Sequence, residues 1–174
     1  KEVILKGLDF SDTQGDKEVV TILKEMGANI EIGEKEIVVK GSVLTGGTFD
    51  LNAMPDALPA LSIAACFAEG ETQLVNVPQA RLKETDRISV MCQELTKMGA
   101  QIKELDDGLV IQKSELIGCE VNGHFDHRVV MSLAVAGLFA KGITEITTAE
   151  AVSVTFPHFK ELMTGLGASI AVVE

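Results

Sequence analysis

The sequence has no tryptophan and no tyrosine, so seven phenylalanines are its only aromatic residues. Proteins that bind single-stranded nucleic acid stack the bases on aromatic side chains, and this chain offers few of them. Its formal net charge of −11 is also opposite to that of a nucleic-acid-binding protein. We therefore expect no nucleic-acid partner. A bound anion would have to be held by a few cations gathered in one place.

Cysteine is also scarce, and the three that are present, Cys66, Cys92 and Cys119, are far apart. Their odd number and wide spacing give neither a disulfide framework nor a zinc pattern. Small core side chains in a reducing, cytoplasmic compartment explain them best. No signal peptide is visible and no apolar run reaches the ~20 residues of a membrane span, so we expect no membrane partner. The chain opens at Lys1 rather than Met, inside a strand-like run, and we interpret it as part of a longer protein.

Hydrophobic residues make up 46% of the chain and charged residues 24%, which excludes a disordered protein. Three stretches resemble one another, and each predicts an amphipathic helix that ends at glycine. The glycines are Gly27, Gly99 and Gly167, which recur at nearly equal intervals along the chain. Glycine suits the left-handed position just past a helix. An alternating strand is predicted after each glycine, and a further strand follows the first two, at 33–41 and 106–114.

A second element repeats at the spacing that separates Gly27 from Gly99, because residues 55–77 align with residues 127–149. Each stretch begins with a helix that is apolar on nearly every side, which predicts burial all round beneath sheets. The repeated unit is therefore strand, buried helix, strand, amphipathic helix, strand, strand. Almost three copies fit, with the first and last incomplete. No linker interrupts them, so we predict one α/β (α+β) domain over residues 1–174.

Charged residues stand where the buried helices are predicted to begin, at Asp56 in one unit and at the equivalent Arg128 in the next. Asp56 suits a first helical turn, whereas Arg128 opposes the helix dipole. Arg87 poses the same problem in "RLKETDRISV", residues 81–90, which we predict to be the start of a helix. A bound anion would remove both conflicts. The alternative for Arg128 is a salt bridge to Asp126 or a neighbouring acid.

These positions suggest a pocket for a small, multiply anionic substrate whose chemistry moves protons. The candidate anion-binding residues are Lys83, Arg87 and Arg128. The candidate acid/base residues are Asp56 and Glu84. For Glu84 the alternative is an N-terminal helix acid that satisfies backbone donors.

A metal site is a weaker reading of the run "HFDH", which places His124 and His127 close to Asp126. Two histidines without a clear third ligand are a poor zinc pattern, so we expect no metal. His158 is most simply a polar surface residue of an amphipathic helix.

The runs "RLKETDR", "PDALPALSIAACFAEGET", "DHRVVMSLAVAGLFAKG" and "SVTFPHF" closely resemble the 5-enolpyruvylshikimate-3-phosphate synthase family, in the same order and over essentially all 174 residues. The resemblance implies the C-terminal domain of a two-domain, monomeric enzyme. Each domain is an inside-out α/β barrel of three βαβαββ units, with buried helices and outer sheets. The implied reaction transfers the enolpyruvyl group of phosphoenolpyruvate to the 5-hydroxyl of shikimate 3-phosphate and releases phosphate. It belongs to the shikimate pathway of aromatic amino acid biosynthesis and needs no metal or organic cofactor.

The resemblance also implies roles for individual residues on the shikimate 3-phosphate side. Asp56 contacts the reacting hydroxyl and accepts its proton, and Lys83 lies on the shikimate-phosphate side. Gln79 stands where many family members have asparagine, and it still offers amide hydrogen bonds to the same substrate. Glu84 matches the carboxylate implicated in proton transfer at the enolpyruvyl methylene.

On the phosphoenolpyruvate side, Arg87 and Arg128 match arginines that hold the substrate carboxylate, with His127 beside them. Val154 stands where many members carry a lysine that contacts the phosphate, which puts that contact and glyphosate sensitivity in question. The partner of this chain is then its own N-terminal domain, and we expect the isolated chain to be inactive.

Two other functions are compatible with parts of the pattern. The enolpyruvyl transferase that acts on UDP-N-acetylglucosamine shares the fold, but its corresponding segments lack the Lys-Glu-Thr-Asp-Arg run. A non-catalytic repeat domain would use the same charges only to solvate its helix ends.

Overall fold

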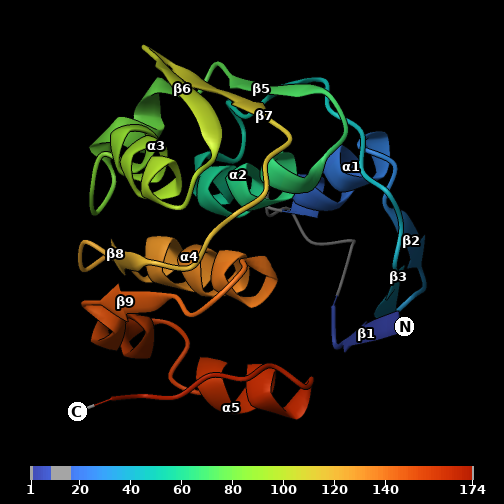
Figure 1. Cartoon of the computed structure of the whole chain (residues 1–174). Helices are drawn as coiled ribbons and strands as arrows, with labels where there is room; N and C mark the ends of the chain where they lie inside the picture. The colour runs from blue at the N-terminus through green and yellow to red at the C-terminus, as the bar shows by residue number, and fades with distance from the viewer. Residues whose placement is uncertain (1, 9–16, 174) are drawn as a thin grey trace.

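A computed structural model describes residues 2–8 and 17–173 of the chain (Figure 1). The first unit and the second contain β1 (Glu2–Lys6), α1 (Glu18–Glu25), β2 (Asn29–Ile32), β3 (Glu36–Lys40), β4 (Thr48–Asp50), η2 (Pro55–Ala57), α2 (Leu58–Phe67), β5 (Glu71–Val75), η3 (Pro78–Leu82), α3 (Arg87–Lys97), β6 (Gln101–Leu105) and β7 (Gly108–Gln112). The third contains β8 (Glu120–Asn122), α4 (His127–Phe139), β9 (Glu145–Thr147), η4 (Ala149–Val154) and α5 (Phe159–Gly165). The elements labelled η are short 3-10 helices.

The described strands form three sheets, one for each unit, in the orders β1-β3-β2, β4-β5-β7-β6 and β8-β9. The strands on either side of each apolar helix, β4 with β5 and β8 with β9, pair in parallel. Their registers match, because Thr48 lies opposite Gln73 and the equivalent residues of the next unit, Glu120 and Glu145, also lie opposite each other. The strands that follow α1 and α3 form antiparallel hairpins. The repeat predicted from the sequence is therefore also a repeat of backbone structure.

The three amphipathic helices α1, α3 and α5 end in the same way. Gly27, Gly99 and Gly167 have φ values of +95°, +88° and +99°. The alanine after each glycine donates its N–H to the carbonyl five residues earlier, at 2.8 to 2.9 Å. This is the Schellman motif, and it confirms the predicted glycine stops.

The third unit differs from the prediction after Gly167. The sequence alternates there, but residues 168–173 do not form a strand and extend past α5 toward the C terminus (Figure 1). In the second unit, β7 lies between β5 and β6 and gives both strands a partner. Among the described residues, β9 pairs only with β8, and no equivalent of β7 is present. Alternation alone does not make a strand when no neighbouring strand is available to accept its hydrogen bonds.

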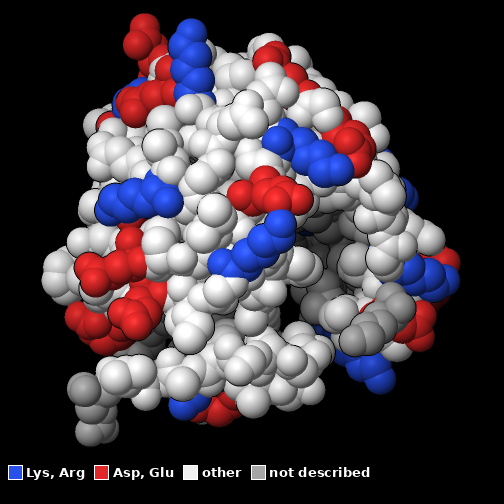
Figure 2. Space-filling view, viewed as in Figure 1, with Lys and Arg blue, Asp and Glu red and all other residues white. Residues whose placement is uncertain are grey.

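The main core lies between the apolar helix α2 and the four-stranded sheet, with α3 and α4 packed beside them (Figure 1). The prediction that α2 and α4 are buried on every side is only partly correct. Ala60 on α2 and Phe139 at the end of α4 are exposed. A groove of about 180 Å³ lies between these helices, and its apolar walls include Ile63, Met131 and Val135. In the space-filling view the surface is hollowed between the sheet that contains β1 and the layer that contains α5 (Figure 2).

The cysteines agree with the predicted core role in part. Cys66 is buried in α2, and burial raises the pKa of its thiol to about 12. Cys92 and Cys119 are half-buried, and all three cysteines are free. None of the helices in the described part of the chain is long and apolar enough to span a membrane.

Candidate active site

The candidate site lies where α2, α3 and α4 begin. Asp56 is the middle residue of η2, which leads directly into α2. Arg87 is the first residue of α3, and His127 and Arg128 are the first two residues of α4. The beginnings of helices from two repeats thus bring acidic and basic side chains together, as predicted for Asp56, Arg87 and Arg128.

The segment before α3 is not the helix start that its sequence suggests. Residues 78–82 form η3, and Lys83 has an extended backbone with φ −93° and ψ −156°. The α-helix begins only at Arg87, because Asp86 caps it by accepting the N–H of Ser89 at 3.0 Å. Lys83 and Arg87 are therefore not one helical turn apart. The like-charge repulsion that a helix over residues 81–90 would impose on Lys83 and Arg87 is therefore avoided.

Arg81 does not belong to the cluster of cations, although it is close in sequence. Its Nη1 lies 2.7 Å from Asp86, and its Nη2 lies 2.8 Å from Glu104. Its Nε donates to the backbone carbonyl of Asp106 at 2.8 Å. Arg81 thus ties the segment to the β6–β7 hairpin.

The carboxylate of Asp56 is the meeting point of the three predicted cations. Lys83 Nζ lies 3.0 Å and Arg87 Nη1 2.8 Å from its Oδ1, and Arg128 Nη2 lies 3.3 Å from its Oδ2. Burial is the largest single influence and acts to raise the pKa of Asp56. The three cations together nevertheless lower the pKa of Asp56 below its ordinary value of 3.8. Asp56 is therefore ionised at neutral pH and holds the three cations in one place.

Arg87 is 1% exposed, which is unusual for an arginine and requires charged partners. Its Nε lies 2.8 Å from Asp126, its Nη1 lies 2.8 Å from Asp56, and its Nη2 lies 2.6 Å from Glu84. Burial acts to lower the pKa of Arg87, but these carboxylates raise it. In this arrangement each nitrogen of the guanidinium already has a carboxylate partner.

Asp126 has a larger role than its sequence position indicates. It is fully buried, and its Oδ1 accepts the N–H groups of Arg128 at 2.9 Å and Val129 at 3.4 Å, which caps α4. Burial acts to raise the pKa of Asp126, whereas Arg87 and these N–H groups lower it. The sequence offers Asp126 as a partner for Arg128, but its side-chain partner is Arg87. The useful signal was its position directly before an apolar helix, which is typical of an N-cap.

Glu84 is the more accessible of the two candidate acid/base residues. Its carboxylate is 47% exposed, and its Oε1 lies 3.8 Å from His127 Nδ1. Gln79 lies in η3, where its Nε2 donates to the carbonyl of Asn52 at 2.8 Å and to the Asn52 side chain at 3.1 Å. Its amide is therefore held in a fixed orientation.

The remaining candidates contribute less to this cluster. Val154 is an exposed residue at the end of η4, and it offers an anion no charge. His124 binds Glu94, whereas His127 faces Glu84. Within the described ranges, no three His, Cys, Asp or Glu side chains are placed to hold a metal ion. His158 is exposed at the beginning of α5, as predicted.

The fold and the site together define a repeat-built α/β protein that gathers arginine, lysine and carboxylate groups at the beginnings of its helices. The family profile described as EPSP synthase (3-phosphoshikimate 1-carboxyvinyltransferase) matches residues 1–163. The chain belongs to this family.

Relatives and solved structures agree with this assignment. The 3-phosphoshikimate 1-carboxyvinyltransferase of Acetivibrio thermocellus is 58% identical over all 174 residues, which cover 41% of that protein. That of Methanocaldococcus jannaschii is 41% identical over 172 residues, covering 98% of this chain and 40% of that protein. A solved structure of EPSP synthase from Acinetobacter baumannii superposes with a TM-score of 0.89 at 35% identity, over 99% of this chain and 43% of that one. The predicted fold is confirmed, and the chain spans about two fifths of the length of these relatives.

Proposed function

We propose that the intact protein transfers the enolpyruvyl group of phosphoenolpyruvate to the 5-hydroxyl of shikimate 3-phosphate and releases phosphate. Residues 1–174 would form its C-terminal domain and supply one side of a site completed by the N-terminal domain. The observation that carries this proposal is the convergence of Lys83, Arg87 and Arg128 on Asp56. Family membership supports the same reaction.

Arg128 is the arginine most readily available to the carboxylate of phosphoenolpyruvate. Its side chain is 37% exposed, and its contact with Asp56, at 3.3 Å, is the longest of the three. Arginine can present two parallel N–H groups to a carboxylate, which fixes the orientation of the substrate as well as binding it. His127, on the adjacent position of α4, lies 3.8 Å from Glu84.

Arg87 can bind the same carboxylate only by exchanging a partner it already has. Glu84 is the partner best suited to leave, because its half-exposed carboxylate returns to water at little cost. A substrate carboxylate that replaces Glu84 at Nη2 keeps the buried charge of Arg87 paired. The exchange also frees Glu84 to take up a proton from solvent and to deliver that proton to the enolpyruvyl methylene.

In this proposal Asp56 acts on the acceptor hydroxyl, and Lys83 and Gln79 bind the same substrate. The hydroxyl oxygen attacks C2 of phosphoenolpyruvate and its proton passes to Asp56, while C3 gains a proton to give a tetrahedral ketal phosphate. Loss of phosphate and of a methyl proton then restores the double bond. Positioning and electrostatic stabilisation supply most of the rate in such a site.

The test is phosphate release by the full-length enzyme with both substrates. We expect Asp56→Ala and Arg128→Ala to lower kcat/KM by about a hundredfold or more. Lys40→Ala, which removes an exposed surface pair with Glu31, is the matched control and should leave activity unchanged. The isolated chain, residues 1–174, should show no turnover.

Two outcomes would replace the proposal. Turnover with UDP-N-acetylglucosamine and not with shikimate 3-phosphate would assign the other enolpyruvyl transferase reaction. Full activity in both alanine variants would mean that these charges only stabilise the helix ends.

A further inference from the structure

Glu94 is a buried acid in the middle of α3 whose position in the core needs an explanation. It is 1% exposed, and its carboxylate accepts hydrogen bonds from three donors in different places. His124 Nε2 lies 2.9 Å away, the backbone N–H of Asn122 lies 2.9 Å away, and Lys97 Nζ lies 2.7 Å away. These donors lower the pKa of Glu94 although burial, the largest influence, acts to raise it. The ionised carboxylate can only accept, so His124 carries its proton on Nε2.

The internal repeat shows that the fold itself does not require this bridge. At the positions one repeat earlier, Ile22 of the first unit replaces Glu94 of the second, and Asn52 of the second unit replaces His124 of the third. Ile22 is buried on α1 as an ordinary apolar core residue. An apolar side chain therefore satisfies the same place in the architecture. The charged bridge is therefore found where the second unit meets the third, next to Asp126, and not where the first unit meets the second.

The loop of the third unit that this bridge holds is strained. His124 and Phe125 have φ values of +52° and +56°, a left-handed conformation that costs about 1–2 kcal/mol for each residue. Asn52, at the equivalent position, does not adopt it. Strained residues of this kind persist only when their surroundings fix them. The bond from His124 to Glu94, together with that from the Phe125 N–H to Thr148 at 3.2 Å, does so here.

Asp126 follows the strained pair directly and is the buried partner of Arg87. Its backbone N–H bonds the carbonyl of Gly123 at 2.9 Å, so its position depends on the loop. Its carboxylate in turn holds Arg87 Nε at 2.8 Å. A continuous series of contacts therefore runs from Glu94 through the loop to the guanidinium.

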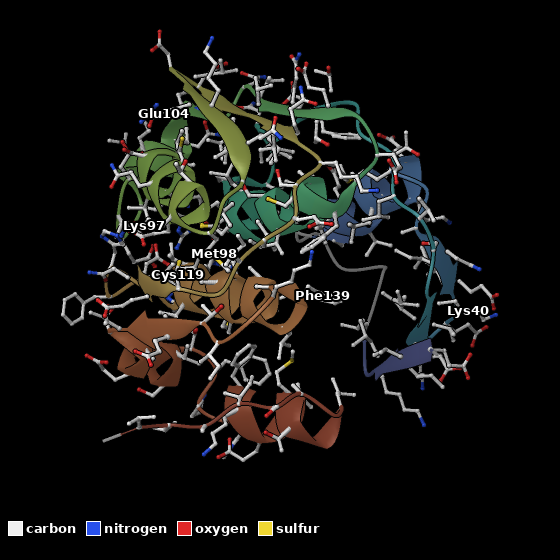
Figure 3. All side chains as sticks on the ribbon, in the orientation of Figure 1. Lys40, Lys97, Met98, Glu104, Cys119 and Phe139 are labelled. Atoms are coloured by element: carbon white, nitrogen blue, oxygen red, sulfur yellow. The ribbon has the colours of Figure 1, made fainter. Side chains whose placement is uncertain are left out.

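We infer that Glu94 and His124 are positioning residues, which hold the 123–126 loop so that Asp126 orients the guanidinium of Arg87 for an anionic substrate. The inference rests on the proposed function for the identity of that substrate. Figure 3 shows Lys97, the other side-chain partner of Glu94, between the layer of α3 and the layer of α4. Lys97 reaches Glu94 from α3 itself, and among the described residues its hydrogen bonds go to Glu94 and not to the loop, which makes it a matched control.

The first test compares His124→Ala and Lys97→Ala in the full-length enzyme. We expect His124→Ala to raise KM for phosphoenolpyruvate about tenfold or more, because a displaced binding group weakens substrate positioning. KM for shikimate 3-phosphate should stay the same, since Lys83 and Arg128 still hold Asp56. Lys97→Ala should change neither value. His124→Gln, whose amide can donate from a similar distance, should restore most of the loss.

The second test does not depend on the reaction. We expect the N–H of Arg87 Nε, followed by NMR, to exchange faster with solvent in His124→Ala than in wild type or in Lys97→Ala. If the full-length protein does not use phosphoenolpyruvate, the proposed function fails while this measurement still decides the inference. Unchanged exchange in His124→Ala, or an equal rise of both KM values with a lower melting temperature, would overturn it.

Discussion

The beginnings of α2 and α4 occupy equivalent places in the repeat but carry opposite chemistry. Asp56 at one corresponds to Arg128 at the other, and the buried Met54 corresponds to the buried Asp126. Asp56 and Arg128 face a common space and form an ion pair, whereas Asp126 pairs with Arg87. The repeat thus presents one backbone twice, and differences at a few positions of one face bring these opposite charges together.

The C-terminal ends of α2 and α4 also carry opposite charges at equivalent positions, but these charges do not come together. Glu69 follows α2 and Lys141 follows α4 at the equivalent position. Each pairs with an exposed partner, Lys113 and Glu115 respectively. Exposed pairs contribute little, whereas a buried pair is costly to break. The same change of charge therefore matters at one end of the helices and not at the other.

The largest effect should come from replacing Asp126, before α4, by methionine, the residue that stands at the equivalent position before α2. Asp126→Met leaves Arg87 buried without its Nε partner, and we expect unfolding free energy to fall by about 3–5 kcal/mol. Chemical denaturation of the intact protein measures this. Met54→Leu, a change of similar volume in the equivalent place, should cost less than about 1.5 kcal/mol. Equal losses of unfolding free energy in the two variants would contradict the difference between the two helix beginnings.

The carboxylate of Asp126 should also govern the stability of the protein in acid. Its folded pKa is lowered, so its contribution is present above the unfolded value of 3.8 and is lost as pH falls through the folded value. We expect wild-type stability to decline below about pH 4 in denaturation midpoints measured against pH. Asp126→Met should decline less steeply over that window. Parallel curves for the two proteins would assign the acid transition to other groups.

An intermediate effect is expected at Gly123, whose counterpart in the other unit is Leu51. A Cβ at Gly123 would lie 2.2 Å from Val130 Cγ2, so the loop cannot accept the side chain that the other unit carries. Gly123→Ala should lower unfolding free energy by about 1–3 kcal/mol. Val130→Ala in the same protein should recover part of the loss by removing the clashing methyl group. No loss in the single variant would show that the loop adjusts freely.

The smallest effect should come from the exposed end of α4. Lys141→Ala breaks only the surface pair with Glu115, and we expect the denaturation midpoint to stay unchanged at any salt concentration. A drop in the denaturation midpoint that disappears in high salt would mean that this end of α4 contributes more to stability than its exposure suggests.

Much of the architecture was predictable because it depends on short-range rules. The stops at Gly27 and Gly99 follow from the left-handed conformation that glycine tolerates, and the unit order follows from the internal repeat. The strand expected after Gly167 did not form. A strand requires a neighbour, and neighbours cannot be counted from one stretch of sequence.

The residues of the candidate site could be predicted from the sequence, but their contacts with one another could be predicted less well. Opposed charges at helix beginnings pointed to Asp56, Arg87 and Arg128, and these converge. The sequence did not indicate that Arg87 would be buried or that Asp126 would be its partner, because both facts depend on how two repeats pack. Whether these residues bind and convert substrates as assigned stays a prediction.

The pairing of the site charges determines how strongly this face attracts a charged molecule at a distance. Lys83, Arg87 and Arg128 are balanced by three carboxylates, Asp56, Glu84 and Asp126, in a chain whose net charge is −11. Because these described charges are paired, we expect this face to exert little positive field on an approaching metabolite. Arg87 in particular can bind an anion only when that anion displaces a resident carboxylate. Encounter with this face should therefore be governed by ordinary diffusion and be largely insensitive to ionic strength.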